Sequence, residues 1–386
     1  MIAAYSATIM FTPVPPDVRS RRLVSIDALR GFDMVVVSAA SFLVAMKGLT
    51  GVAGVDWLAD QLTHPAWNGF TFYDFLFPLF LFVAGVSLSF SLGKWTAVGS
   101  SHGELYRKAF IRFLMLYCLG TLYSNLPVPF LEPEKIRFVN VLGRIGLASF
   151  VSTVLYLNFS RHSRLIWVSA ILLGYYAALF LIPVPGYGAG DLSVEGNLVG
   201  WIDRSVLPGR LLQGNYDELG LLTQLPALCL VVLGTVAGDI LRSEVTEQRK
   251  LRELTIAGVA ATALGLLWSL HFPLNKHLWS SSFIALTGGM AFLSMALFYA
   301  VIDVWNYRKW AFFFQVIGVN SLIVYLAYRL IDFYFTSRLL FSSLYAPLPK
   351  EWRSVLDELG AAALVWILPY ILYRFRIHWP ASTKKP

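Results

Sequence analysis

Residues 64–92 read HPAWNGFTFYDFLFPLFLFVAGVSLSFSL, and this stretch places polar side chains directly before a long apolar run. Its first eleven residues contain an imidazole (His64), a carboxamide (Asn68) and a carboxylate (Asp74). The run that follows, 75–92, carries no charged residue and approaches the roughly 20 apolar residues that a transmembrane helix needs. The stretch therefore predicts a membrane-spanning helix with titratable groups at its boundary.

The composition of the whole chain is that of a membrane protein. Of the 386 residues, 57% are hydrophobic and 14% are charged, whereas a soluble domain carries about 25% charged residues. The mean hydropathy is +0.62. The apolar runs do not alternate with polar residues as the strands of a transmembrane barrel do. We expect an all-α polytopic integral membrane protein with about ten transmembrane helices, at 23–46, 69–92, 107–126, 138–158, 165–183, 219–241, 253–271, 279–302, 310–335 and 355–376.

The positive charge of the chain indicates its orientation in the membrane. The net charge is +8, but the basic residues are spread over short segments between spans, so nucleic-acid binding is not expected. About twice as many Lys and Arg residues fall on the side of the termini as on the other side, which predicts that both termini are cytoplasmic. His64 and the loop 184–218 would then face outward.

The chain divides into one membrane domain and two tails. Residues 1–21 are proline-rich and lack the basic start of a signal peptide, so we expect a disordered N-terminal tail. The membrane domain spans 22–378, and a C-terminal tail follows at 379–386. The loop 184–218 is rich in glycine and acidic residues. It is either a solvated connector or a cover that shapes the access of a polar substrate.

Charged residues inside the predicted spans are candidates for function, because they are costly in a bilayer. Asp27, Arg30 and Asp33 are spaced by three and can share one helix face. They form either a self-neutralised ion triplet or the polar wall of an intramembrane site. Arg112 lies at a depth similar to that of Arg30, and two guanidinium groups suit phosphate oxygens. Arg112 can equally extend to the interface.

Further polar and aromatic candidates lie at or near the outward ends of the spans. Two of these candidates, Asn320 and Ser321 in span 310–335, can instead be ordinary groups that form hydrogen bonds between helices. The turn 272–282 is harder to explain as a simple reversal of the chain. The candidates are Arg144, Asn275, Lys276, Trp279, Asn320 and Ser321.

The opening stretch itself suggests acyl transfer. Asn68 or Thr71 can cap the helix that follows, and Trp67 can anchor it at the interface. Asp74 lies one to two turns into the span, and a carboxylate near an imidazole raises its basicity. His64 would thus act as a base, or carry an acyl group. We find no metal-ligand spacing, nucleophile elbow, Walker loop or dinucleotide motif in the sequence.

These residues resemble the bacterial relatives of lysosomal heparan-alpha-glucosaminide N-acetyltransferase, in the transmembrane acyltransferase superfamily. The resemblance covers 22–376, nearly the whole chain. It rests on six motifs in the same order: SIDALRG at 25–31, HPAWNGFTFYD at 64–74 with Phe77-Pro78 and Gly85, VLGRIG at 141–146, YDELGLL at 216–222, PLNKHLWS at 273–280 and NSLIVY at 320–325.

The resemblance implies transfer of an acetyl group from acetyl-CoA to an amino sugar across a bacterial inner membrane. His64 matches the catalytic histidine of the family. Asp74 would orient His64, while Asn68, Asn275 and Lys276 would hold the carbonyl or the acceptor. We expect no metal, and a homodimer is consistent with the resemblance. We expect direct transfer rather than an acetyl-histidine intermediate.

The remaining candidates would contact acetyl-CoA or the acceptor: Asp33, Arg30, Arg112, Arg144, Trp67, Trp279, Asn320 and Ser321. Two alternatives stay open. One is a secondary transporter of a sugar or an anion, which would use the same charges as a path. The other is O-acylation of a cell-envelope glycan.

Overall fold

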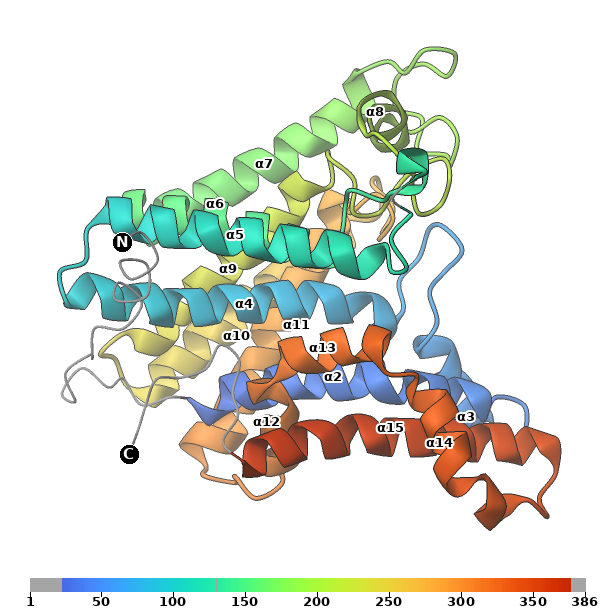
Figure 1. The fold of residues 1–386 in the computed structure, drawn as a ribbon. Coiled ribbons are helices and arrows are strands. Elements are labelled where there is room, and N and C mark those ends of the chain that lie inside the picture. The colour runs from blue at the N-terminus through green and yellow to red at the C-terminus, as the bar shows by residue number, and fades with distance from the viewer. Residues whose placement is uncertain (1–22, 130, 376–386) are drawn as a thin grey trace, which may run out of the picture.

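The computed structural model of the chain describes residues 23–129 and 131–375. The predicted tails 1–21 and 379–386 lie outside these residues. The described chain is helical and has no named strand (Figure 1). Its helices are α2 (Val24–Ala45), α3 (Ala53–Gln61), α4 (Phe72–Ala97), α5 (His102–Ser124), α6 (Val141–Asn158), α7 (Arg161–Leu181), α8 (Leu198–Val206), α9 (Gln224–Arg242), α10 (Glu247–Trp268), α11 (Ser281–Phe298), α12 (Ala311–Val319), α13 (Ser321–Leu330), α14 (Phe333–Phe341) and α15 (Lys350–Arg374).

Most of these helices are long and apolar enough to cross a membrane. Eight of those in the described residues meet that condition alone, and α12 with α13 makes a ninth if the pair is one span. The polytopic helical fold is therefore confirmed. Helix α5 corresponds to the predicted span 107–126 but is not among the eight, because Arg107, Lys108 and Arg112 make it less apolar. The count of ten spans stays a prediction.

The predicted span 310–335 is wrong as a single helix. Helices α12 and α13 are bent by 69° at Asn320. Gly318 lies just before the bend, against α2: a Cβ on Gly318 would lie 1.8 Å from the carbonyl oxygen of Asp27. This close crossing, typical of small residues in membrane helices, fixes α12 on α2 while α13 turns away.

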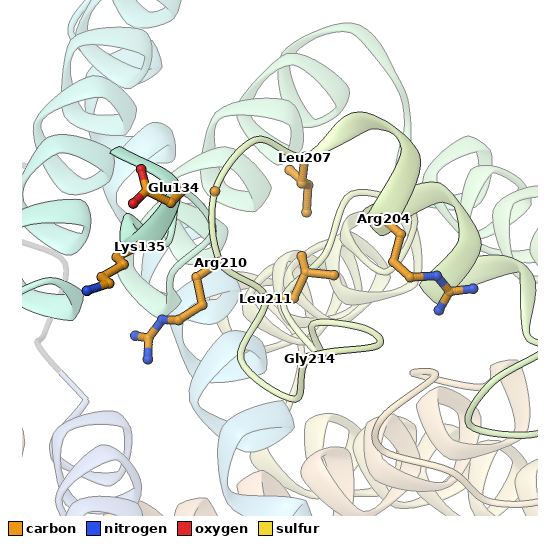
Figure 2. A pocket seen from close by; sticks show the side chains of 8 residues that line it. Glu134, Lys135, Arg204, Leu207, Arg210, Leu211 and Gly214 are labelled. Carbon is orange, nitrogen blue, oxygen red and sulfur yellow. The ribbon is translucent and has the colours of Figure 1, made fainter. Parts of the chain in front are cut away.

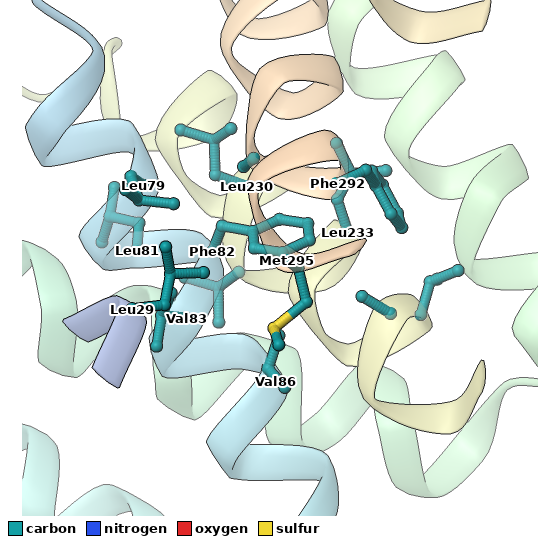
Figure 3. Close-up of a cluster of buried hydrophobic side chains, with 14 of the residues drawn as sticks. Leu29, Leu79, Leu81, Phe82, Val83, Val86, Leu230, Leu233, Phe292 and Met295 are labelled. Atoms are coloured by element: carbon teal, nitrogen blue, oxygen red, sulfur yellow. The ribbon is translucent and has the colours of Figure 1, made fainter. Parts of the chain in front are cut away.

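The core lies where α4, α9 and α11 meet, with α2 beside them (Figure 3). Phe82 of α4 packs its ring on Phe292 of α11, with centroids 4.9 Å apart. Gly85 and Gly234 let α4 and α9 approach closely, because a Cβ on Gly85 would lie 2.0 Å from the carbonyl oxygen of Val231. A tightly packed core of this kind holds α4 rigidly, and α4 carries the residues of the opening stretch.

The two ends of the helix bundle differ. At one end, which we call the His64 end, lie α3, α8, α14 and the long connections (Figure 1, right). At the other end, which we call the Arg30 end, the connections 98–101, 159–160 and 243–246 are short.

The loop 184–218 is folded and anchored to the rest of the chain, and we call it the folded cover. It contains α8, which Asn197 caps through a 2.7 Å hydrogen bond from the Gly200 amide. Buried Asp217 receives two hydrogen bonds from Arg137, of 2.7 and 2.6 Å. Burial raises the pKa of Asp203, another buried carboxyl of this loop, to about 6. The hydrogen bonds from Arg137 thus hold the loop to the connection between α5 and α6.

Candidate active site

His64 and Asp74 are joined by the cap of α4. Thr71 is the N-cap residue, and its backbone N–H donates to Asp74 Oδ2 at 3.1 Å in a capping box. The other oxygen, Oδ1, lies 2.6 Å from His64 Nδ1. Asp74 therefore lies in the first turn, and its predicted position one to two turns into the helix is wrong. Asp74 is fully buried, whereas the His64 side chain is 39% exposed. The buried carboxylate orients an accessible imidazole.

Lys276 is the third member of this group. Its Nζ lies 2.9 Å from His64 Nε2 and 3.4 Å from Nδ1, so the amine sits beside the imidazole and nearer to Nε2. It is also 4.0 Å from Asp74 Oδ1 and 3.7 Å from Glu218 Oε2. Because a carboxylate only accepts, we assign the ring proton to Nδ1, which leaves the Nε2 lone pair available. His64 is thus set up as a base through Nε2.

Two loops are tied together beneath this group. Asn275 donates to Asn68 Oδ1 at 3.0 Å, and the Gly69 amide donates to the Leu274 carbonyl at 2.9 Å. Asn275 also accepts from the Leu278 amide at 2.8 Å, which shapes the turn that presents Lys276. Asn68 is therefore a link between loops, and the helix cap belongs to Thr71. The structure brings together His64, Asn68, Asp74, Asn275 and Lys276 as predicted.

An aromatic group stands beside the loops. Trp67 stacks on His277 with ring centroids 5.3 Å apart, and its indole N–H donates to the Leu192 carbonyl of the folded cover at 2.9 Å. Tyr216 Oη lies 3.0 Å from His277 Nδ1. Burial raises the pKa of Tyr216 to about 12 and lowers that of His277, so Tyr216 donates to a neutral His277. His277, the second histidine at the His64 end, is therefore held in place by ring stacking and a hydrogen bond.

Three predicted residues lie inside the protein. Arg144 is 1% exposed and stacks on the Trp279 ring at 4.5 Å from the centroid, while it donates to Thr223 Oγ1. Its Nε and Nη1 have no hydrogen-bond partner in the part of the chain that the structure describes. Asn320 is buried at the α12–α13 bend. None of the three lines the large cavity, so direct contact with a substrate there is not seen for them.

A cavity of about 740 Å³ runs between α2, α4, α5, α6 and α13. Its walls are mainly apolar, with Arg30, Asp33, Arg112 and Ser321 among the polar lining residues. Two lining residues of α4, Tyr73 and Ser91, lie 18 positions apart, which is about 27 Å along a helix. The cavity therefore extends along most of the roughly 30 Å thickness of a bilayer core.

The polar residues of this cavity differ in their partners. Arg30 is held by Ser87 Oγ at 2.5 Å and by Asp27 at 3.6 Å, so that part of the predicted triplet is confirmed. Asp33 is buried, and its Oδ1 has no hydrogen-bond partner in the described ranges. Arg112 makes no ion pair with a described residue. The cavity thus has free polar groups to offer a ligand.

Tyr73 connects the cavity to His64. Its ring centroid is 4.8 Å from that of the His64 imidazole, and the same ring lines the cavity. The candidate base is therefore separated by one aromatic ring from a cavity that Arg30 and Arg112 also line.

A shallower pocket of about 430 Å³ lies on the folded cover (Figure 2). Lys135, Arg204 and Arg210 line it. Arg204 is tied to the carbonyls of Asn215 and Glu195, at 2.6 and 3.1 Å. This arginine therefore braces the cover.

The prediction from sequence missed Tyr73, Tyr216, Glu218 and His277. All four lie in the motifs quoted for the resemblance, but a tyrosine or a glutamate in a loop has no spacing that indicates a partner. Glu218 lies 58 positions from Lys276, and only the folded cover brings the two together.

The comparisons with known proteins identify the family of this chain. The family model described as "Heparan-alpha-glucosaminide N-acetyltransferase, catalytic" matches residues 22–273. The chain belongs to this family. The match includes His64, Asp74 and Glu218, and it confirms the resemblance seen in the motifs.

Two curated relatives extend the comparison. Heparan-alpha-glucosaminide N-acetyltransferase of Homo sapiens is 28% identical over 437 aligned residues, which cover 97% of this chain and 61% of the human protein. The Mus musculus protein of the same name is 26% identical, over 93% of this chain and 60% of the mouse protein. The chain thus spans about three fifths of the length of these relatives.

Proposed function

We propose that the protein is a membrane-embedded acetyltransferase that moves an acetyl group from acetyl-CoA to the amine of an amino sugar. One observation carries the proposal: the Asp74-oriented His64 packs against Tyr73, and Tyr73 lines the same cavity as Arg30 and Arg112. The names of the human and mouse relatives support an amino-sugar acceptor. The acceptor would be met on the extracytoplasmic side of a bacterial inner membrane, as the charge distribution and the resemblance suggest.

The donor would lie along the cavity. Its phosphates would meet Arg112, which has no ion pair among the described residues, with Arg30 beside it. The free oxygen of Asp33 faces a largely apolar cavity and would accept from an amide N–H of the donor's arm. Ser321 lines the same space. The thioester would then reach Tyr73 and His64.

The transfer would proceed at the His64 end. The acceptor's amine would take the place that the Lys276 amine occupies beside Nε2, and Lys276 would turn toward Glu218. Nε2 removes the amine proton as the amine attacks the thioester carbonyl, and Asp74 stabilises the imidazolium that forms. The carbon–sulfur bond breaks, and coenzyme A leaves as a thiol. Asn68, Asn275 and Lys276 would hold the developing oxyanion or the sugar.

Two further features fit a sugar acceptor. Trp67, in its stack with His277, offers an aromatic wall next to the site. The folded cover 184–218 contacts that wall through Leu192. We keep direct transfer, and the Lys276 amine at 2.9 Å from His64 Nε2 supports the view that an amine fits beside this base. A homodimer remains part of the proposal by resemblance.

The test is an assay of thiol release from acetyl-CoA by the purified protein, with glucosamine or with glucose. We expect release with glucosamine alone. Release with glucose would indicate O-acylation. Absence of release with either sugar would contradict the acetyltransferase, and sugar uptake by proteoliposomes without release would indicate the transporter.

A further inference from the structure

Lys276, His64 and Asp74 form a compact cluster, because the Lys276 amine lies 3.4 Å from His64 Nδ1 and 4.0 Å from Asp74 Oδ1 as well as close to Nε2. Asp74 orients the imidazole from the Nδ1 side at 2.6 Å, and the lysine amine lies 2.9 Å from Nε2. A nucleophile beside a base, with the base oriented by a third group, is the arrangement that activates nucleophiles in covalent catalysis. Here the group in the nucleophile's position is an amine, the same chemical class as the proposed acceptor.

We propose that Lys276 is an acetylation site of this protein, modified by its own donor when the acceptor is absent. The inference rests on the proposed function, since it uses the same base and the same thioester. It adds a second acceptor, which belongs to the chain itself.

Acetylation of Lys276 would consume one acetyl-CoA and release one coenzyme A. His64 Nε2 takes a proton from the Lys276 ammonium, and the neutral amine attacks the acetyl carbonyl. The nitrogen–carbon bond forms, the carbon–sulfur bond breaks, and the leaving thiolate takes the proton from the imidazolium. The products are an amide on Lys276, coenzyme A and one proton released from the ammonium. An amide does not pass its acetyl group on as a thioester does, so the modified protein would lose its cation between Asp74 and Glu218 and stop turning over.

The groups around Lys276 affect the rate of its acetylation. Asp74 at 4.0 Å and Glu218 at 3.7 Å form ion pairs with the Lys276 amine, and these contacts must break before the amine can attack a thioester. Self-acetylation would therefore be slow beside transfer to a sugar amine.

Lys47 provides an internal control. It lies at the same His64 end, its side chain is 52% exposed against 13% for Lys276, and it pairs with Asp60 at 2.5 Å. Among the described residues, its side chain forms an ion pair with Asp60 and contacts no histidine. Chemical acetylation in solution would favour exposed Lys47, whereas acetylation by the site would favour Lys276.

The experiment is peptide mass spectrometry after incubation of the purified protein with acetyl-CoA alone. We expect one acetyl group on Lys276, little on Lys47, and suppression of the modification by glucosamine. His64→Gln should slow it about a hundredfold, the lower range for loss of a general base. The lysine should stay unmodified in a sample that lacks acetyl-CoA.

Three results would overturn the inference. One is unmodified Lys276 in protein that releases thiol with glucosamine, which would leave the proposed function standing. Another is equal modification of Lys276 and Lys47, which would show chemical acetylation. The third is an acetyl group on His64, which would show a covalent intermediate. No thiol release with glucosamine would remove the proposed function and this inference together.

Discussion

The two ends of the cavity are built in different ways. At the His64 end, Asp74, Asn68, Asn275 and Lys276 are fixed by hydrogen bonds between loops that lie far apart in the sequence. Toward the Arg30 end, the polar lining residues stand on the faces of separate helices, and Arg112 has no ion pair with any described residue.

This difference corresponds to two kinds of task. A proton transfer needs a base held in one geometry, and hydrogen bonds between loops supply it. A flexible polyanion needs positive charge at a suitable depth, which single arginines on helices provide. The predictions below test that division, in order of decreasing effect.

The largest effect is expected from Asp74→Asn. The amide would donate to Nδ1, so His64 would carry its proton on Nε2 and could not accept one there. We expect acetyl transfer to fall about a hundredfold or more. Thiol release with glucosamine measures it.

Thr71→Ala is the matched control for Asp74→Asn. It removes the Thr71 hydroxyl, which donates to the Thr63 carbonyl at 2.6 Å and to Asp74 Oδ2 at 3.3 Å, and it leaves the carboxylate and the backbone N–H that bonds to it, so stability should fall by about 1 kcal/mol. The rate should fall much less than in Asp74→Asn. Equal losses of rate in the two variants would mean that Asp74 acts only as a cap.

A smaller effect is expected from Arg112→Ala. Loss of one charged contact to a phosphate should raise the KM for acetyl-CoA about tenfold and change kcat little. Arg107→Ala, which removes an exposed arginine of the same helix that does not line the cavity, is the control. A fall in kcat with unchanged KM would contradict the claim that the Arg30 end binds the donor while the His64 end performs the proton transfer.

The smallest effect concerns the pH dependence of stability through His277. Burial lowers the pKa of this histidine, so the unfolded chain binds its proton more readily. Its contribution to stability is present above the unfolded pKa of about 6.5 and is lost as the pH falls through the folded pKa. Asp203, whose pKa burial raises to about 6, acts in the opposite direction over part of this range. The contribution of His277 is therefore measured as the difference in pH dependence between the unaltered protein and a variant that lacks this histidine.

The variant is His277→Gln, compared with the unaltered protein by thermal unfolding at about pH 7.5 and about pH 5.5. The unaltered protein should lose more Tm than the variant on acidification. A larger loss in the variant would show that His277 is charged in the folded protein.

The sequence predicted the pairing of His64 with Asp74 because this contact is local. His64 and Asp74 are ten positions apart and meet through one helix cap, so a short stretch contains both the base and its partner. Asn275 and Lys276 were visible as polar groups in a short turn. Their contact with His64 and Asn68 was implied only by the resemblance.

Long-range contacts could not be predicted in this way. The Arg137–Asp217 pair joins residues 80 positions apart, and it holds the cover that brings Glu218 to Lys276. The bend at Asn320 depends on the contact of Gly318 with α2, which no local pattern indicates. Neither the cavity nor the free oxygen of Asp33 follows from periodicity, because both depend on how helices pack.

The central claim is that His64 performs the chemistry and does not hold the donor. The most direct test compares His64→Ala with the unaltered protein in two measurements: thermal stabilisation by acetyl-CoA, and thiol release with glucosamine. We predict equal stabilisation and a loss of release of about a hundredfold or more. Full release by His64→Ala would contradict the account.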